Sequence, residues 1–331
     1  MLVTGGAGFI GTNFVRHTLA TRPDYRITVL DAMTYAANPR NLAGLDIDLV
    51  VGDICNPELV DALVADHDVV VHFAAESHND NSLTSPAPFV QTNVMGTFNI
   101  LEAVRKHRRR LHHISTDEVF GDLPIDDPVR FHEYSPYRPS SPYSATKASA
   151  DHLVQAWIRS FEVAATISNC SNNYGPYQHI EKFIPRQITN VLSERTPKLY
   201  GTGEQIRDWI HVDDHNEAVL QIIERGQLGQ TYLIGADNDQ LNNKAIISMI
   251  LELMGKDPAD FEHVADRPGH DQRYAINASK LRRELGWQPQ YTDTEGMRAG
   301  LVQTITWYRE HSSWWQDSKQ AVEAQYQARG Q

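Results

Sequence analysis

Two short stretches of the sequence carry side chains suited to acid–base chemistry. Thr116, Asp117 and Glu118 are consecutive, and Tyr143 precedes Lys147 by four positions. Neighbouring carboxylates repel each other, so their pKa values separate and one serves as an acid while the other serves as a base. Residues four apart share a helix face, where the lysine favours the phenolate and lets it take a proton from an alcohol. The two stretches predict a base for an alcohol and an acid–base pair for the atoms beside it.

The elements around these stretches must bring them together. The segment Leu111–Ser115 predicts a strand that ends at the two acids, Asp122–Pro142 predicts a surface loop, and Tyr143–Phe161 predicts a helix. Ligands in open α/β sheets bind at the carboxyl edge of the strands, which is where this strand delivers the acids. A turn with solvated acids and a chance tyrosine–lysine spacing are the alternatives when each stretch is taken alone.

The N-terminal residues predict a dinucleotide site, because a short apolar run is followed by a glycine-rich turn and a helical pattern. Gly6, Gly8 and Gly11 fit G-x-G-x-x-G, and Gly5, Gly8 and Gly11 fit the wider spacing G-x-x-G-x-x-G. Glycine lets the backbone turn tightly and approach a pyrophosphate, whose charge is favoured at the helix N-terminus. An ordinary glycine-rich turn is the alternative for this motif alone.

Acids at the ends of the next predicted strands support the same interpretation. The strand Arg26–Leu30 leads into Asp31, and an acid there accepts hydrogen bonds from the adenosine ribose and repels a 2′-phosphate. No arginine directly follows Asp31, which favours NAD over NADP. Asp53, near the end of the predicted strand Asp48–Ile54, either reaches the adenine amine or only completes a turn.

The order of the predicted elements indicates the fold class. Strands alternate with helices through the first half, and Asp68–Ala75 is almost continuously apolar, as in a parallel strand covered on both faces. We expect an α/β protein with a Rossmann-type doubly wound parallel sheet and a smaller C-terminal α/β substrate-binding domain. The expected NAD-binding part is 1–170. The expected nucleotide-sugar-binding part is 171–331, with some of its segments returning to the sheet.

The C-terminal half shows more irregular patterns. Helices are expected at Asn242–Met254, Ser279–Leu285 and Glu295–Trp315, and Asn169–Pro176 reads as a polar loop. The last residues, Gln316–Gln331, read as a polar tail that Trp314 and Trp315 pack back onto the protein.

Composition excludes several function classes. The net charge of −12 argues against a nucleic-acid-binding surface, which needs lysine and arginine. The only cysteines, Cys55 and Cys170, cannot form a disulfide framework or a zinc cluster, so we expect no metal. No stretch approaches the length of a membrane span and no signal peptide is evident, so a cytoplasmic protein is expected. Asp213–His215 is interpreted as a helix N-cap rather than a metal triad.

The motifs and their order along the chain resemble those of the extended short-chain dehydrogenase/reductase superfamily, and within it the nucleotide-sugar 4,6-dehydratases, with dTDP-glucose as the implied substrate. The resemblance covers essentially the whole chain. The segments that carry it are Thr4–Gly11, Ala74–His78, Ser115–Val119, Tyr143–Lys147, Ser171–Tyr177, Arg207–Trp209 and Asp266–Asp271. The triplet Thr116–Glu118 discriminates within the superfamily. Related epimerases lack both acids there, and the mannose and glucuronate relatives usually carry Thr-Ser-Glu.

The resemblance implies a role for each proposed catalytic residue. Tyr143, assisted by Lys147, removes the proton from the sugar O4 while NAD takes the C4 hydride, and Thr116 hydrogen-bonds O4. Glu118 then removes the C5 proton and Asp117 protonates the departing C6 hydroxyl. The hydride returns to C6, so NAD is regenerated, and the implied product is dTDP-4-dehydro-6-deoxy-glucose.

The resemblance also implies the binding residues. The expected contacts to NAD are Gly5, Gly8, Phe9, Ile10, Gly11, Asp31, Ala32, Met33, Thr34, Asp53, Ile54, Ala74, Ala75, Ser77, Thr92, Tyr143, Lys147 and Asn173. The expected contacts to the nucleotide sugar are Ser77, His78, Thr116, Asn172, Lys182, Phe183, Lys198, Leu199, Tyr200, Arg207, Asn242, Arg267, His270 and Asp271. Arg207 is the expected diphosphate clamp, because its planar fork suits two phosphate oxygens. A homodimer through the helices Pro88–His107 and Tyr143–Phe161 is implied as well.

The sequence departs from the family pattern in a few places. Asn79 stands where the family often has valine, Asn81 where it often has arginine, and Phe120 where it often has tyrosine. Other functions stay open at this stage. The chain is alternatively a 4-epimerase, a dehydratase of a UDP, GDP or CDP sugar, or a non-catalytic NAD-binding regulator. The adjacent acids disfavour the epimerase, which needs no acid at C6.

Overall fold

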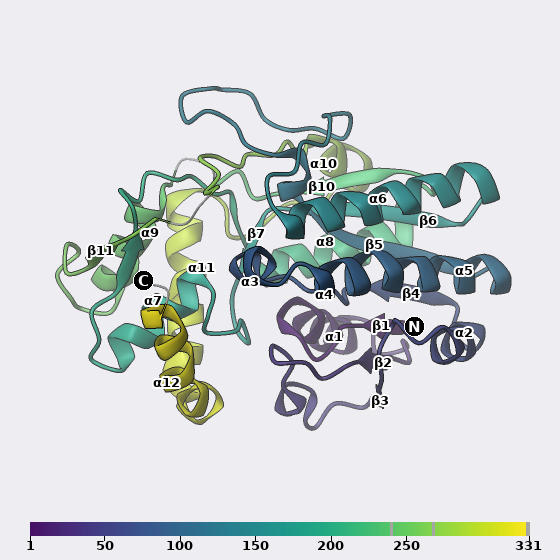
Figure 1. Cartoon of the computed structure of the whole chain (residues 1–331), viewed down its shortest axis with the longest axis horizontal. Helices are drawn as coiled ribbons and strands as arrows, with labels where there is room; N and C mark the ends of the chain where they lie inside the picture. The colour runs from purple at the N-terminus through teal and green to yellow at the C-terminus, as the bar shows by residue number, and fades with distance from the viewer. Residues whose placement is uncertain (239–240, 267–268, 329–331) are drawn as a thin grey trace.

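Seven parallel strands form the central sheet, in the order β10-β6-β5-β4-β1-β2-β3 (Figure 1). The computed structural model describes residues 1–238, 241–266 and 269–328. The strands are β1 (Leu2–Thr4), β2 (Thr28–Asp31), β3 (Asp48–Val51), β4 (Val69–His72), β5 (Arg110–Thr116), β6 (Ala165–Cys170) and β10 (Thr231–Ile234). The order reverses between β1 and β4, which is the position where doubly wound sheets bind their ligands. The predicted fold class is confirmed.

Helices cover both faces of this sheet. On one face lie α1 (Phe9–Thr21) and α8 (Val212–Arg225), and on the other lie α2 (Pro57–Ala65), α5 (Thr97–His107) and α6 (Pro142–Phe161). Successive strand residues point to opposite faces, so Val3 and Val29 pack in the first core while Leu2 and Leu30 pack in the second. Because both faces of the sheet are buried, its strands are apolar. Each fully buried large apolar side chain adds about 1.5–3 kcal/mol to the free energy of unfolding.

The start of α6 is fixed by its cap. Ser141 Oγ accepts the Ser144 backbone N–H at 3.1 Å, and Ser144 Oγ accepts the Ser141 N–H at 3.0 Å. Pro142 occupies the first helical position, where its missing N–H costs nothing. This capping box sets the first turn of α6, and with it the places of Tyr143 and Lys147.

The helix predicted for Pro88–His107 has an irregular first half. It consists of α4 (Ala87–Phe89), a π-helical segment η2 (Val90–Gly96) and α5. Buried Asn93, inside the π segment, accepts from the Glu76 N–H at 2.8 Å and donates to the Glu76 carbonyl and to Thr146 Oγ1, both at 3.0 Å. The π segment therefore ties the loop after β4 to α6.

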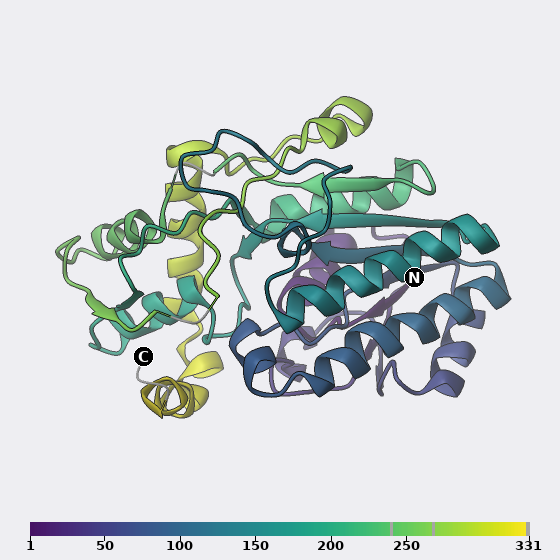
Figure 2. The ribbon, with the colours of Figure 1, turned by 45° about the horizontal axis from the view of Figure 1, so that its top comes forward.

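The C-terminal half builds a smaller α/β unit at one side of the sheet, visible at the left of both views (Figure 1, Figure 2). Its strand pairs are β7 (Asn172–Tyr174) with β9 (Trp209–His211), and β8 (Lys198–Tyr200) with β11 (Glu262–Val264). Its helices include α7 (Phe183–Leu192), α9 (Asn243–Leu253) and α11 (Asp293–Glu310), while α10 (Ser279–Leu285) packs on α8 and β10. The prediction of a loop at Asn169–Pro176 is wrong at β7, because Trp209–His211 supplies a pairing partner from far along the chain.

The predicted polar tail is also wrong, because α11 ends at Glu310 and a second helix, α12 (Ser312–Ala328), follows. Its buried side chains, Trp315, Lys319, Val322, Glu323 and Tyr326, recur at helical spacing. The stripe mixes charged and apolar residues, which is why it reads as polar in sequence. Packing through the tryptophans is confirmed, since Trp315 is buried and Trp314 Nε1 donates to Asn41 Oδ1 at 2.7 Å. Within the described ranges, no helix is both long and apolar enough to cross a membrane.

Candidate active site

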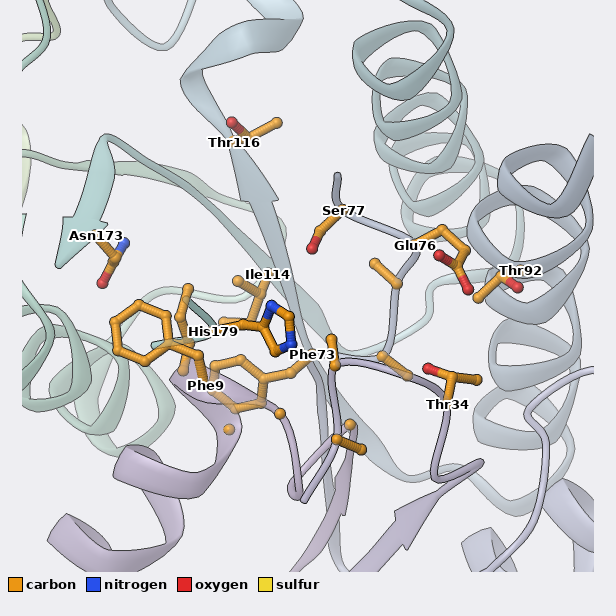
Figure 3. Close-up of a pocket in the computed structure, with 18 of the residues that line it drawn as sticks. Phe9, Thr34, Phe73, Glu76, Ser77, Thr92, Ile114, Thr116, Asn173 and His179 are labelled. Carbon is orange, nitrogen blue, oxygen red and sulfur yellow. The ribbon is translucent and has the colours of Figure 1, made fainter. Parts of the chain in front are cut away.

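A cavity of about 330 Å³ opens at the carboxyl ends of β1, β2, β4 and β5 (Figure 3). Side chains from several elements converge on it, including Phe9 at the start of α1, Thr34 after β2, Ser77 after β4 and Thr116 at the end of β5. Every predicted NAD contact except Met33 lines this cavity. The sheet edge thus gathers residues that are far apart in the sequence.

The glycine turn forms one wall of the cavity, and the protein leaves no room for a side chain at Gly5 or Gly11. Gly5 has φ +73°, and a Cβ on Gly11 would lie 2.3 Å from the Gly5 carbonyl oxygen. Gly5, Gly8 and Gly11 line the cavity, whereas a Cβ on Gly6 would meet Val29 at 2.7 Å in the core. The wider of the two spacings is therefore the one that faces the cavity. With α1 starting at Phe9, this cradle fits a dinucleotide pyrophosphate.

Asp31 is held at the end of β2 by two backbone amides. Its carboxylate accepts from Ala7 N at 2.9 Å and from Met33 N at 2.8 Å. Burial raises the pKa of Asp31, while these two hydrogen bonds act in the opposite direction. The carboxylate lines the cavity, so its remaining lone pairs suit ribose hydroxyls. Met33 supports this acid through its backbone and does not line the cavity.

Tyr143 and Lys147 both lie at the cavity, but the ammonium is engaged elsewhere. Lys147 Nζ donates to the Ile114 carbonyl at 2.7 Å, and burial lowers the pKa of Lys147. Burial, followed by the charge of Glu118, raises the pKa of Tyr143 well above its usual value. Desolvation of the phenolate is thus the largest effect on the pKa of Tyr143, and the prediction that Lys147 lowers this pKa stays a prediction.

The two adjacent acids occupy different environments. Strand β5 ends in a 3₁₀ turn, η3 (Asp117–Phe120), in which Thr116 Oγ1 accepts the Glu118 N–H at 3.2 Å. Asp117 is 1% exposed, and burial, then the charge of Glu118, raises its pKa well above the usual carboxyl value. Glu118 is half-buried, lines the cavity and accepts a hydrogen bond from Asn79 Nδ2 at 2.9 Å. The turn therefore places one carboxyl in the protein interior with a raised pKa and the other at the wall of the cavity.

A second cavity of about 180 Å³ adjoins the first. The predicted substrate residues that line it are Ser77, His78, Asn172, Lys182, Phe183, Lys198, Tyr200, Arg207 and His270. Thr116 lines the first cavity instead, and Arg267 lies outside the described residues. Seven residues line both cavities, namely Ser77, Glu118, Asn172, Asn173, Gln178, Glu181 and Lys182. Glu118 thus stands where the two cavities meet.

Three predicted substrate residues do not line the second cavity. Leu199 is buried in the core, and Asn242 caps α9 by accepting from Ala245 N at 2.8 Å. The Asp271 carboxylate accepts from Ser140 Oγ at 2.7 Å and from the Tyr274 hydroxyl. Each of these side chains packs against or bonds to a neighbouring element in the structure.

Arg207 is fixed in the wall of the second cavity. Its guanidinium donates to the backbone carbonyls of Ile206 at 2.7 Å and Asp271 at 2.8 Å, and it lies 4.2 Å from the centre of the Tyr274 ring. Because these partners hold it rigidly, little rotamer freedom is lost when its other N–H groups meet an anion.

Several lining residues were not predicted. Glu76, His179 and Glu181 line the first cavity, and Arg186 and Tyr326 line the second. Glu76 and His179 adjoin predicted motifs, so proximity in sequence was a usable signal for them. Arg186 and Tyr326 carry no local signal, because they meet only through the packing of α12 against α7. Among the described residues, no group of three or more histidine, cysteine or acidic side chains is arranged to hold a metal ion.

Comparisons with known proteins agree with this geometry. A dTDP-glucose 4,6-dehydratase of Mycobacterium tuberculosis is 62% identical over 333 residues, covering 100% of this chain and 99% of that protein. The crystal structure of the dTDP-glucose 4,6-dehydratase DesIV from Streptomyces venezuelae, with NAD bound, superposes with a TM-score of 0.89 at 42% identity, covering 95% and 98% of the two chains. A UDP-glucose 4-epimerase from Thermus thermophilus, also with NAD, has a TM-score of 0.85 at 27% identity, covering 94% and 99%.

A family model described as GDP-mannose 4,6 dehydratase matches residues 2–299. The match includes the glycine turn, both acids, the tyrosine–lysine pair and most of the second cavity. The chain therefore belongs to the nucleotide-sugar 4,6-dehydratase family of the extended short-chain dehydrogenases/reductases.

Proposed function

We propose that this chain is an NAD-dependent dTDP-glucose 4,6-dehydratase, which converts dTDP-glucose to dTDP-4-dehydro-6-deoxy-glucose and water. The observation that carries the proposal is the pair of unlike acids. Asp117 is buried, and the adjacent Glu118 lines the cavity together with Tyr143. An elimination across C5 and C6 needs an acid and a base that lie close to each other. The curated relatives named above, which act on this sugar nucleotide, support the choice of substrate.

The first step is the oxidation of C4. Bound NAD supplies a hydride acceptor for C4 and later returns the hydride to C6. Tyr143 takes the proton from O4, and Thr116, whose hydroxyl adjoins Asp117 at 3.3 Å, orients O4. Burial opposes the phenolate, so the positive charges of Lys147 and of the oxidised nicotinamide are needed to bring the pKa of Tyr143 down.

The elimination uses the two acids. A C4 ketone acidifies C5–H, and Glu118 removes that proton. Asp117, protonated because of its burial, gives its proton to the departing C6 hydroxyl, so water leaves and no charged hydroxide is released. After hydride return to C6, the Glu118 carboxyl, having exchanged its proton with solvent, protonates C5. Over the whole cycle Tyr143 has gained the O4 proton and Asp117 has lost one to the departing water, so Tyr143 must release a proton and Asp117 must take one up before the next turnover.

A 4-epimerase is the runner-up within the enzymes. An epimerase needs only the C4 oxidation and a rotation of the ketosugar, so it has no use for an acid at C6. The burial of Asp117 beside Glu118 favours the dehydratase.

The experiment is incubation of the purified protein with dTDP-glucose in heavy water, followed by mass spectrometry. We expect loss of one water with one deuterium at C5, and a loss of product formation of about 10³-fold in Glu118→Gln. An unchanged mass with dTDP-galactose appearing would contradict the roles of both acids. Loss of water only from another sugar nucleotide would correct the substrate alone.

We also propose how the parts of the chain are organised. Residues 1–170 form the NAD-binding part, and 171–331 form mainly the nucleotide-sugar part with β10 added to the sheet. A homodimer through the helices at Pro88–His107 and Tyr143–Phe161 is supported by exposed apolar side chains there, since Val90 is 51% exposed, Met95 44% and Phe161 42%. A cytoplasmic location is part of the same proposal.

A further inference from the structure

One contact in the site joins a residue at which the sequence departs from its family to the proposed C5 base. Asn79 begins the short helix α3 (Asn79–Thr84), which follows β4, and its Nδ2 donates to Glu118 Oε2 at 2.9 Å. The two residues are 39 positions apart in sequence. The amide N–H is a donor and the carboxylate an acceptor, so the contact joins two complementary groups from separate segments of the chain.

We propose that Asn79 is a positioning residue for the dehydration step, and that its amide holds the Glu118 carboxylate toward the substrate as the charged partner of the acid pair. This proposal rests on the dehydratase function given above. Asn79 lines the second cavity, and Glu118 lines both. The amide thus approaches the carboxylate from the sugar side, where C5 would be placed.

The chemistry of the amide explains the selectivity of this contact. An N–H group can only donate, so it favours a charged carboxylate over a protonated one. Asp117 accepts a longer hydrogen bond from the Thr116 hydroxyl, 3.3 Å from its Oδ1, and its side chain is 1% exposed. Although that hydrogen bond favours the carboxylate, burial has the larger effect and raises the pKa of Asp117, so the proton of the pair is biased toward Asp117. Glutamate has several rotatable bonds, so fixing one oxygen also reduces the number of unproductive orientations.

The backbone of Asn79 is itself held by a hydrogen bond within α3. Ser82 Oγ donates to the Asn79 carbonyl at 2.6 Å within the first turn of α3, and Ser82 is fully buried. The backbone of Asn79 is thus anchored while its side chain reaches the cavity. Asn81 lies on the same helix, but its Nδ2 faces the Tyr35 hydroxyl at 3.4 Å rather than a carboxylate of the acid pair.

The test separates hydride transfer from elimination in the NAD-loaded full chain. Asn79→Val should lower kcat for dTDP-glucose dehydration about tenfold with little change in KM. The variant loses a hydrogen bond to a charged group, and Glu118 acts in the elimination step, which follows substrate binding. A larger fraction of the nicotinamide should be reduced in the steady state, as measured by its near-ultraviolet absorbance. The 4-ketosugar intermediate accumulates because the misplaced Glu118 slows the elimination. Deuterium entry at C5 should slow by the same factor as kcat.

Two further variants complete the experiment. Asn79→Asp keeps the shape but replaces the donor with a second charge, so it should be slower than Asn79→Val. The matched control Asn81→Val should keep the wild-type kcat and fraction of reduced nicotinamide. Equal kcat in wild type and Asn79→Val, or a loss with no rise in reduced nicotinamide, would overturn the proposal. An inactive wild type would overturn the proposed function instead, and that result is seen before any variant is made.

Discussion

At the scale of single residues, burial rather than identity distinguishes the two acids. Asp117 and Glu118 have the same chemistry and adjacent positions, yet the 3₁₀ turn buries one and leaves the other at the cavity. The turn is set by Thr116, whose hydroxyl accepts from the Glu118 backbone. A local cap thus sets the turn that separates the two side chains, while the surrounding fold decides which of them is buried.

The raised pKa of Asp117 predicts a pH-dependent cost in stability. In the unfolded chain this acid titrates near its usual pKa of about 4, whereas in the folded protein the proton is held to higher pH. As pH rises above about 4, the unfolded state releases the proton first, so the free energy of unfolding falls by about 1.4 kcal/mol per unit between the two pKa values. Asp117→Asn removes this slope.

We therefore expect Asp117→Asn to be more stable than wild type at pH 8 and similar to it at pH 4, as measured by denaturant unfolding at both values. The same variant should lose about 10²–10³-fold in kcat, because the leaving hydroxyl has no acid. Asp126→Asn, on the exposed loop before α6, is the control and should change neither quantity. A stability gain that is independent of pH would count against a buried, protonated Asp117.

At the scale of elements, α12 completes the second cavity from the far end of the chain. Its Glu323 pairs with Arg186 of α7 at 3.1 Å and with Lys319 of its own helix at 2.8 Å. The Arg186 guanidinium lies 3.4 Å from the centre of the Tyr326 ring, and both residues line the cavity. The buried ion pairs therefore hold part of the proposed nucleotide site in place.

Glu323→Gln leaves Arg186 and Lys319 buried without their carboxylate. We expect the free energy of unfolding to fall by about 3 kcal/mol, and KM for dTDP-glucose to rise more than kcat falls. The matched control is Glu252→Gln, which breaks a surface pair with Arg298 at 2.7 Å and should cost about 0–1 kcal/mol. Urea unfolding and steady-state kinetics provide both readouts. A variant with unchanged KM would show that α12 does not shape the nucleotide site.

At the scale of the whole molecule, two binding regions built from different halves of the chain share one boundary. The first cavity belongs mainly to the parallel sheet, and the second mainly to the C-terminal unit. The residues common to both come from the loop after β4, the turn after β5 and the segment around β7. Glu118, which lines both cavities, lies at this shared boundary.

The outer face of α5 and α6 gives a prediction at this scale. Both helices lie side by side on one face of the sheet (Figure 1, Figure 2). Met95→Glu places a charge among the exposed apolar residues proposed to form the dimer, so we expect a monomer in sedimentation experiments with NAD still bound. Leu228→Glu, at an apolar residue 49% exposed after α8, is the control and should remain a dimer. An unchanged sedimentation coefficient for Met95→Glu would exclude this face.

The sequence by itself determined the parallel sheet, the glycine cradle, the acid at the end of β2 and the helix that carries Tyr143 and Lys147. These features follow from local signals, namely apolar runs, glycine spacing and the four-residue spacing of Tyr143 and Lys147. Only the tertiary structure decided that Asp117 is buried and that Asn172–Tyr174 is a strand. It also decided that Ser312–Ala328 forms a separate last helix and that the Asn79 amide bonds to Glu118. Burial and pairing depend on segments distant in sequence, and no local pattern encodes which of two identical functional groups loses its water.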